Sequence, residues 1–130
     1  LSDPKYMGCK GFQTADMAEP YFELMYLPFD EGVPLPCFRD SVGRHEDMPE
    51  GFVLYYTNQC PFTAKYVPIL EEMAKARNAV FQSVHIQTRE DAQNAPSPFT
   101  TFSLFYDRQL VTHEILSEKK FDKILADKGV

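Results

Sequence analysis

The sequence predicts an α/β fold in which residues 51–130 follow the order β-α-β-α-β-β-α. A short apolar run at residues 52–56 is long enough for a buried strand. Apolar residues then recur at helical spacing from residue 61 to about residue 77, and residues 80–86 alternate as a second strand. Because a helix of this length joins the two strands, we expect them to run parallel.

The second half of this region continues the alternation of helices and strands. Thr88, with Asp91 three positions later, is typical of a capping box and predicts a short helix that Pro96 and Pro98 end. Residues 101–106 and 110–115 are the next two strands, joined by a turn. Ser117 caps a last helix, whose predicted apolar stripe is Phe121, Ile124 and Leu125.

The first fifty residues do not follow this pattern. Residues 10–16 are a strand candidate, residues 17–20 a turn, and residues 21–29 are apolar nearly throughout, as in a strand covered on both faces. Residues 30–50 contain prolines, glycines and charges that break any period, and a stretch of this length usually joins domains. We therefore predict two strands in residues 1–29, a linker over 30–50 and a domain over 51–130.

Composition excludes several classes of protein. The net charge of −6 argues against a nucleic-acid surface, because phosphate contacts need clustered Lys and Arg. No apolar run approaches a membrane span, and no basic-then-apolar leader begins the sequence. Cys9, Cys37 and Cys60 are an odd number at irregular spacing and form no disulfide framework, so a cytoplasmic protein is expected.

No metal site is predicted. His45, His85 and His113 share no ligand spacing with the cysteines. A histidine in a strand, as His85 is expected to be, is far more often structural or solvated than a ligand. Cys37 could be paired with Cys60 in a functional reading, but no spacing rule supports this pairing.

Cys60 is the residue with the most suggestive chemistry. Proline is tolerated at the first helical position, so Pro61 places Cys60 at the N-cap of the predicted helix. The free N–H groups and the positive dipole end at a helix start favour an anion, and thiol pKa values fall there. Thr63, three residues along the same helix, could donate its hydroxyl to a Cys60 thiolate.

Residues 55–73 resemble the active-site segment of the thioredoxin superfamily. Pro68 lies eight residues after Cys60, as the helix-kinking proline of thioredoxins does, and Cys60-Pro61-Phe62 is closer to the glutaredoxin turn. Thr63 stands where the second cysteine would be. The resemblance implies a thioredoxin-like fold over residues 51–130 and a cis-proline beside the cysteine, for which Pro98 is the candidate and Pro96 the second choice.

Two interpretations of this site stay open. Without a second cysteine, Cys60 cannot form an internal disulfide, but it could act as a monothiol that attacks a disulfide or takes up glutathione. The catalytic set would then be Cys60, Thr63 and Pro98. Alternatively the fold is only a scaffold and Cys60 is an ordinary cap residue, because a fold does not carry a function.

Residues 1–29 resemble the last two strands of GNAT-type N-acetyltransferases. The resemblance rests on Gly11-Phe12, Asp16, Ala18 and the Pro20-Tyr21-Phe22 run, which follow the spacing of that family's closing strands. Nothing in the sequence matches the Arg/Gln-x-x-Gly-x-Gly/Ala loop that holds the acetyl-CoA pyrophosphate there. The resemblance therefore implies no cofactor in this chain, and acetyl-CoA for the parent protein.

Together, these parts resemble the C-terminal region of the YoaP-like N-acetyltransferases, most specifically over residues 90–125. This resemblance implies a thioredoxin-like accessory domain that recognises a substrate or partner and does not acetylate by itself, and the alternative is a monothiol redox domain using Cys60. The expected partners are the upstream acetyltransferase domain, a protein or thiol partner, and a second copy of the chain through the N-terminal strands, with no nucleic acid and no membrane.

Overall fold

The computed structural model describes residues 3–29, 32, 34–43, 45–46 and 48–130. Residues 30, 31, 33, 44 and 47 of the predicted linker lie outside the described residues. The predicted mixed α/β class is confirmed, with two sheets and four helices in the described part of the chain. None of these helices is long and apolar enough to cross a membrane.

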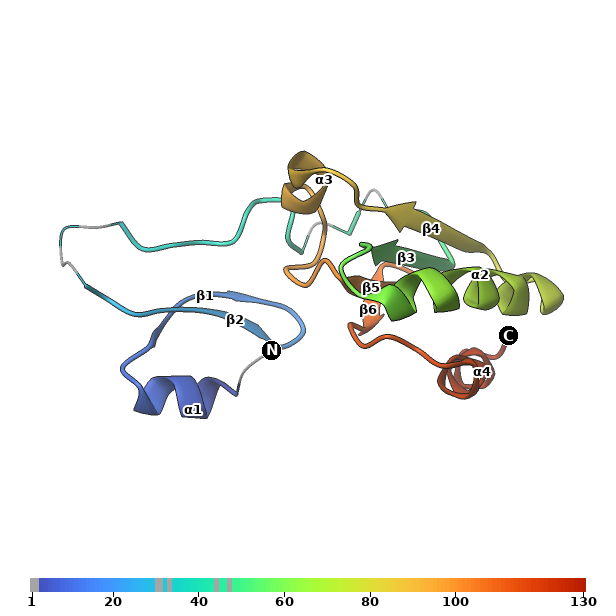
Figure 1. The fold of residues 1–130 in the computed structure, drawn as a ribbon, viewed down its shortest axis with the longest axis horizontal. Helices are drawn as coiled ribbons and strands as arrows, with labels where there is room; N and C mark the ends of the chain where they lie inside the picture. The colour runs from blue at the N-terminus through green and yellow to red at the C-terminus, as the bar shows by residue number, and fades with distance from the viewer. Residues whose placement is uncertain (1–2, 30–31, 33, 44, 47) are drawn as a thin grey trace.

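The N-terminal part is a short helix followed by a hairpin (Figure 1). Helix α1 (Pro4–Cys9) was not predicted, although Asp3, which caps it, and Pro4 at its first position are typical of a helix start. Strands β1 (Gln13–Ala18) and β2 (Phe22–Tyr26) pair antiparallel as a separate sheet. The prediction that the second strand is covered on both faces is wrong, because only Phe22 of its residues is fully buried.

This hairpin docks on the rest of the chain through aromatic rings. Phe22 is 5% exposed, and the rings of Tyr21 and Phe22 lie 5.4 and 5.8 Å from the His113 ring. The Tyr21 hydroxyl also bonds His113 Nδ1. The ring of Phe99 also lies 5.2 Å from the His113 ring. This docking therefore buries apolar surface that a lone two-stranded hairpin could not bury by itself.

The second sheet has the strand order β4-β3-β5-β6. Strand β3 (Phe52–Tyr56) pairs parallel with β4 (Phe81–His85) and antiparallel with β5 (Phe102–Tyr106), which pairs antiparallel with β6 (Gln109–Thr112). The predicted parallel crossover is thus confirmed. The β5–β6 turn uses Asp107 and Arg108, both at positive φ (46° and 70°), which suits the twist of a two-residue hairpin.

The main core lies between this sheet and two helices. Helices α2 (Pro61–Ala76) and α4 (Glu118–Asp127) lie on one side of the sheet (Figure 1). Because side chains alternate along a strand, Phe52 and Leu54 enter this core, whereas Val53 faces the other side and packs with Met48 and Phe105. The core residues are Phe52, Leu54, Val67, Leu70, Ala74, Phe102, Leu104, Leu116, Phe121 and Leu125.

Helix α3 (Arg89–Gln93) connects β4 to the loop before β5. Its predicted capping box is confirmed: Thr88 Oγ1 accepts from the Asp91 N–H, and the Asp91 carboxylate accepts from the Thr88 N–H. The bonds hold the start of α3 at the end of β4. They also fix the residues between β4 and α3, which line one of the two clefts described next.

Candidate functional site

Cys60 lies where the sequence places it, at the N-cap of α2. Its backbone is extended, with φ −111° and ψ 125°, and Pro61 is the first helical residue. The side chain is partly buried and makes no capping hydrogen bond. The predicted position is therefore confirmed, and the catalytic role of Cys60 stays a prediction.

Thr63 does not act on Cys60 as expected. Its side chain is fully buried, and Oγ1 has no hydrogen-bond partner among the described residues. Among the described residues, the hydrogen bond between the two runs from the Thr63 N–H to the Cys60 carbonyl oxygen, at 3.1 Å. The reason is the rotation of α2: Thr63 lies on the buried stripe with Val67, Leu70 and Ala74, which faces the sheet.

Replacing Thr63 with valine should raise the free energy of unfolding by about 1 kcal/mol, because an apolar methyl of the same shape replaces a buried hydroxyl without a partner. Chemical denaturation measures the change. Thr63→Ser keeps the hydroxyl and loses a methyl, so it should be less stable than the wild type. A destabilised Thr63→Val variant would indicate that the hydroxyl has a bonding role.

Pro98 is not a cis-proline. Among the described residues the only cis peptide bond joins Glu19 to Pro20, so the expectation is wrong for Pro98 and for Pro96. Both prolines lie in the loop between α3 and β5, where Ser97 Oγ accepts from the Phe99 N–H at 3.3 Å. The loop is long enough to reach β5 with trans bonds. The grouping of Pro98 with Cys60 and Thr63 stays a prediction.

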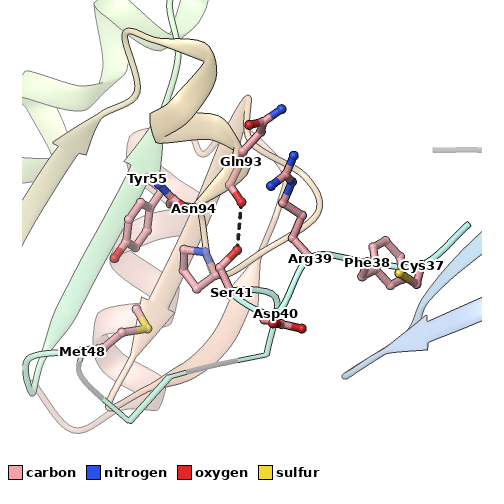
Figure 2. Close-up of a pocket in the computed structure, with 10 residues that line it drawn as sticks. Cys37, Phe38, Arg39, Asp40, Ser41, Met48, Tyr55, Gln93 and Asn94 are labelled. Atoms are coloured by element: carbon pink, nitrogen blue, oxygen red, sulfur yellow. Dashed lines mark hydrogen bonds between the residues drawn. The ribbon is translucent and has the colours of Figure 1, made fainter.

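One cleft lies between the linker, β3 and the end of α3. This linker cleft has a volume of about 780 Å³. In Figure 2, Tyr55 and Met48 lie on the side of β3, and Arg39 and Asp40 on the side of the linker. Its lining residues are Cys37, Phe38, Arg39, Asp40, Ser41, Met48, Tyr55, Gln93, Asn94 and Pro96.

Hydrogen bonds hold the linker over this cleft. Ser41 Oγ donates to the Gln93 carbonyl at 2.9 Å, as the dashed line in Figure 2 shows. The Gly43 N–H donates to the Pro96 carbonyl at 3.0 Å, and the Phe38 N–H donates to the Asp16 carboxylate at 2.8 Å. Residues 38–43 of the predicted linker are thus bonded to β1, to the end of α3 and to the loop after α3.

Tyr55 supplies the cleft with a protonated hydroxyl. Burial raises the pKa of Tyr55 above its usual value of 10.0. The hydroxyl therefore keeps its proton at neutral pH and can donate a hydrogen bond. From the sequence, Tyr55 was expected only as part of a buried strand. The cleft could not be predicted, because residues 39–41 and 93–94 come together only in the tertiary structure.

A second cleft, of about 650 Å³, lies where β3 and β4 end. The side chains that line this strand-end cleft include amides, hydroxyls and one guanidinium. Its lining residues are Thr57, Asn58, Gln59, His85, Ile86, Gln87, Thr88, Arg89, Ala92 and Thr100. Neither cleft is lined by Cys60, Thr63 or Pro98, so the residues predicted as a site lie outside both.

A metal centre has no support in the described residues, where no group of three or more His, Cys, Asp or Glu side chains could hold an ion. All three cysteines are free thiols.

Comparison with known proteins gives two matches. Residues 81–123 match a family described as YoaP-like. Over 125 residues the chain is 39% identical to a protein of Bacillus subtilis (strain 168) named an uncharacterized N-acetyltransferase YoaP. The match covers 96% of this chain and 50% of that protein, so the chain spans about half of its relative's length. No solved structure matches the chain.

These matches support the predicted resemblance to YoaP-like acetyltransferases and contradict the predicted function. The prediction was a thioredoxin-like accessory domain of an acetyltransferase that does not acetylate by itself, with a monothiol redox domain as the alternative. Instead, nearly the whole chain aligns with a protein named an N-acetyltransferase.

Proposed function

We propose that this chain is part of an N-acetyltransferase, an enzyme that moves an acetyl group from acetyl-CoA to an amine. The observation that carries the proposal is the 39% identity over 96% of the chain to a protein named for this activity. The YoaP-like match over residues 81–123 places the same relationship in the C-terminal part of the chain. Because the relative is twice as long, the proposal concerns the protein that contains this chain.

The linker cleft is the proposed acceptor site. Its volume of about 780 Å³ falls within the range of about 300–1,000 Å³ typical of small-molecule sites. The carboxylate of Asp40 can attract a protonated amine, and Arg39 beside it can bind an anionic or carbonyl group of the same acceptor. The cleft thus offers both signs of charge to a polar amine.

Acetyl transfer requires the amine to lose a proton, because only a neutral nitrogen has the lone pair that attacks the acetyl carbonyl. Asp40 is the carboxylate of this cleft and is the proposed proton acceptor. The protonated hydroxyl of Tyr55 can donate a hydrogen bond to the acceptor and orient it. Both roles depend on side chains that the tertiary structure brings to one cleft.

Acetyl-CoA is the acetyl donor that this function implies, and the described residues do not fit its diphosphate. A diphosphate is usually held by a glycine-rich turn that leads into a helix. The turns that lead into α2, α3 and α4 contain no glycine, and Gly51, the closest to α2, precedes β3 instead. We therefore assign no residue of this chain to acetyl-CoA.

The test is an acetylation assay on the full-length gene product. With acetyl-CoA and a mixture of amines, release of the CoA thiol and a mass increase of one acetyl group on an amine are expected. Asp40→Asn should lower kcat/KM by at least about a hundredfold, because the proton acceptor is lost. Asp127→Asn, an exposed change of equal charge at the end of α4, is the control and should leave kcat/KM unchanged.

The two parts of the proposal fail separately. Absence of acetyl transfer to any amine would overturn the function. Transfer that Asp40→Asn leaves unchanged would keep the function and remove the linker cleft as the acceptor site.

For residues 51–130 we also propose a thioredoxin-like topology. The parallel pairing of β3 with β4 and the antiparallel pairing of β3 with β5 and of β5 with β6 support it. The name of the relative instead implies an acetyltransferase fold. A crystal structure of the full-length protein distinguishes the two by its strand order. The topology by itself carries no function.

We propose the cytoplasm as the location. The support is that Cys9, Cys37 and Cys60 are all free thiols, which a reducing compartment maintains. Trapping of free thiols with an alkylating reagent in intact cells would test this, and an intermolecular disulfide in freshly lysed cells would contradict it.

A further inference from the structure

The strand-end cleft occupies the place in an α/β sheet where ligands usually bind. Strands β3 and β4 run parallel, and the cleft is lined by the residues that follow their carboxyl ends, Thr57–Gln59 and His85–Arg89. In open α/β sheets, ligands bind in the crevice outside these strand ends. The position comes from the parallel pairing alone and is independent of the proposed acetyltransferase activity.

Arg89 gives this cleft its positive charge. Its side chain is exposed and forms no ion pair with any residue that the structure describes. A guanidinium presents a planar fork of donors that matches a carboxylate. Helix α2, whose N-cap Cys60 follows Gln59, has no side-chain cap and no acidic residue in its first turn. Its positive end therefore adds to the attraction for an anion beside the cleft.

The remaining polar groups suit a ligand that also carries neutral hydrogen-bonding groups. Gln87 Nε2 lies 3.0 Å from His85 Nδ1, and because an amide nitrogen can only donate, Nδ1 accepts. The His85 ring is stacked on Tyr56, with centroids 4.8 Å apart and planes at 7°. This stacking and the bond to Gln87 fix the orientation of the imidazole without help from a ligand.

The charge balance favours a ligand with a single negative charge. The acidic neighbours are Glu90, exposed on α3, and Asp91, whose carboxylate accepts from the N–H groups of Gln87 and Thr88. They oppose a second negative charge near Arg89. We propose that the strand-end cleft binds a small monocarboxylate that also bears an amide or amine group, with Arg89 holding the carboxylate.

Calorimetric titration of the 130-residue chain with N-acetylglycine is the test, because this probe has one carboxylate and one amide. Saturable binding is expected. N-acetylglycinamide, the neutral counterpart of this probe, should bind at least about tenfold more weakly, because its charge-assisted hydrogen bonds are lost. Inorganic phosphate should also bind at least about tenfold more weakly, because its excess negative charge is left unmatched.

Variants locate the binding. Arg89→Gln should weaken binding of N-acetylglycine at least about tenfold. Arg89→Lys, which keeps the charge and loses the fork, should lie between Arg89→Gln and the wild type. Lys119→Gln removes an exposed positive charge from α4 and should leave binding unchanged. Circular dichroism of each variant checks that it is folded.

The proposal is overturned by any of three results: no saturable binding of N-acetylglycine, equal binding of phosphate, or equal binding by folded Arg89→Gln. Because the assay contains no acetyl-CoA, its outcome does not depend on acetyl transfer. Binding that survives in a protein without acetyltransferase activity would support this site and contradict only the proposed function.

Discussion

Replacing Phe52 with alanine should lower the free energy of unfolding by about 3–5 kcal/mol, the usual cost of removing a buried aromatic ring. The Phe52 side chain is 0% exposed, at the centre of the main core. Its ring lies 4.6 Å from the ring of Tyr106, 5.6 Å from that of Phe121 and 6.3 Å from that of Phe81. One truncation therefore removes contacts to β4, β5 and α4 together.

Urea denaturation followed by circular dichroism measures this loss. The matched control is Phe29→Ala, which removes the same ring from a side chain that is 92% exposed and should change the free energy of unfolding by less than about 0.5 kcal/mol. Similar losses in the two variants would mean that Phe52 is not at the centre of the core. Such a result would also question the packing of α4 on the sheet.

Replacing Gly51 with alanine should lower the free energy of unfolding by about 2 kcal/mol or more, for two reasons that add. Gly51 has φ +88°, a conformation that costs a residue with a Cβ roughly 1–2 kcal/mol. The added Cβ would also lie 2.8 Å from both Cβ and the carbonyl oxygen of Val80. That oxygen accepts from the Phe52 N–H at 2.9 Å, so relief of the clash would disturb the start of β3.

Gly43→Ala separates the two reasons. Gly43 has φ +83°, and a Cβ there would meet nothing within 4 Å. Gly43→Ala should therefore show the backbone cost without the clash. Thermal denaturation of the two variants gives the difference between their losses of stability. Equal losses would indicate that the contact with Val80 relaxes freely, whereas no loss in Gly51→Ala would contradict the close approach of the two segments.

The sequence predicts elements well where local chemistry decides them. Pro61 and the apolar spacing after it place Cys60 at the start of α2, and Thr88 with Asp91 forms the capping box of α3. The parallel pairing of β3 and β4 follows from the length of the helix between them. Two expectations stay predictions: a homodimer through the N-terminal strands, and the division of the chain into residues 1–29, 30–50 and 51–130.

The buried face of α2 shows where local patterns stop being sufficient. Phe62 lies eight positions before the buried Leu70, which is helical spacing for the same face, yet Phe62 is 58% exposed and Thr63 is fully buried. A rotation of about one residue separates the two faces. The sheet and α4 set this rotation, because only one face of α2 can enter a core that Phe52 and Phe121 already occupy.

By itself, the amino-acid sequence determined the α/β class, the start of α2 after Cys60 and the residues that form the turns. Each of these features depends on residues within a few positions of one another. The tertiary structure decided the trans bonds at Pro96 and Pro98, the inward side of Thr63 and both clefts. The linker cleft depends on a bond between Ser41 and Gln93, 52 positions apart, and the strand-end cleft on the pairing of β3 with β4. Contacts at such separations follow from how the whole chain packs, and no local pattern encodes them.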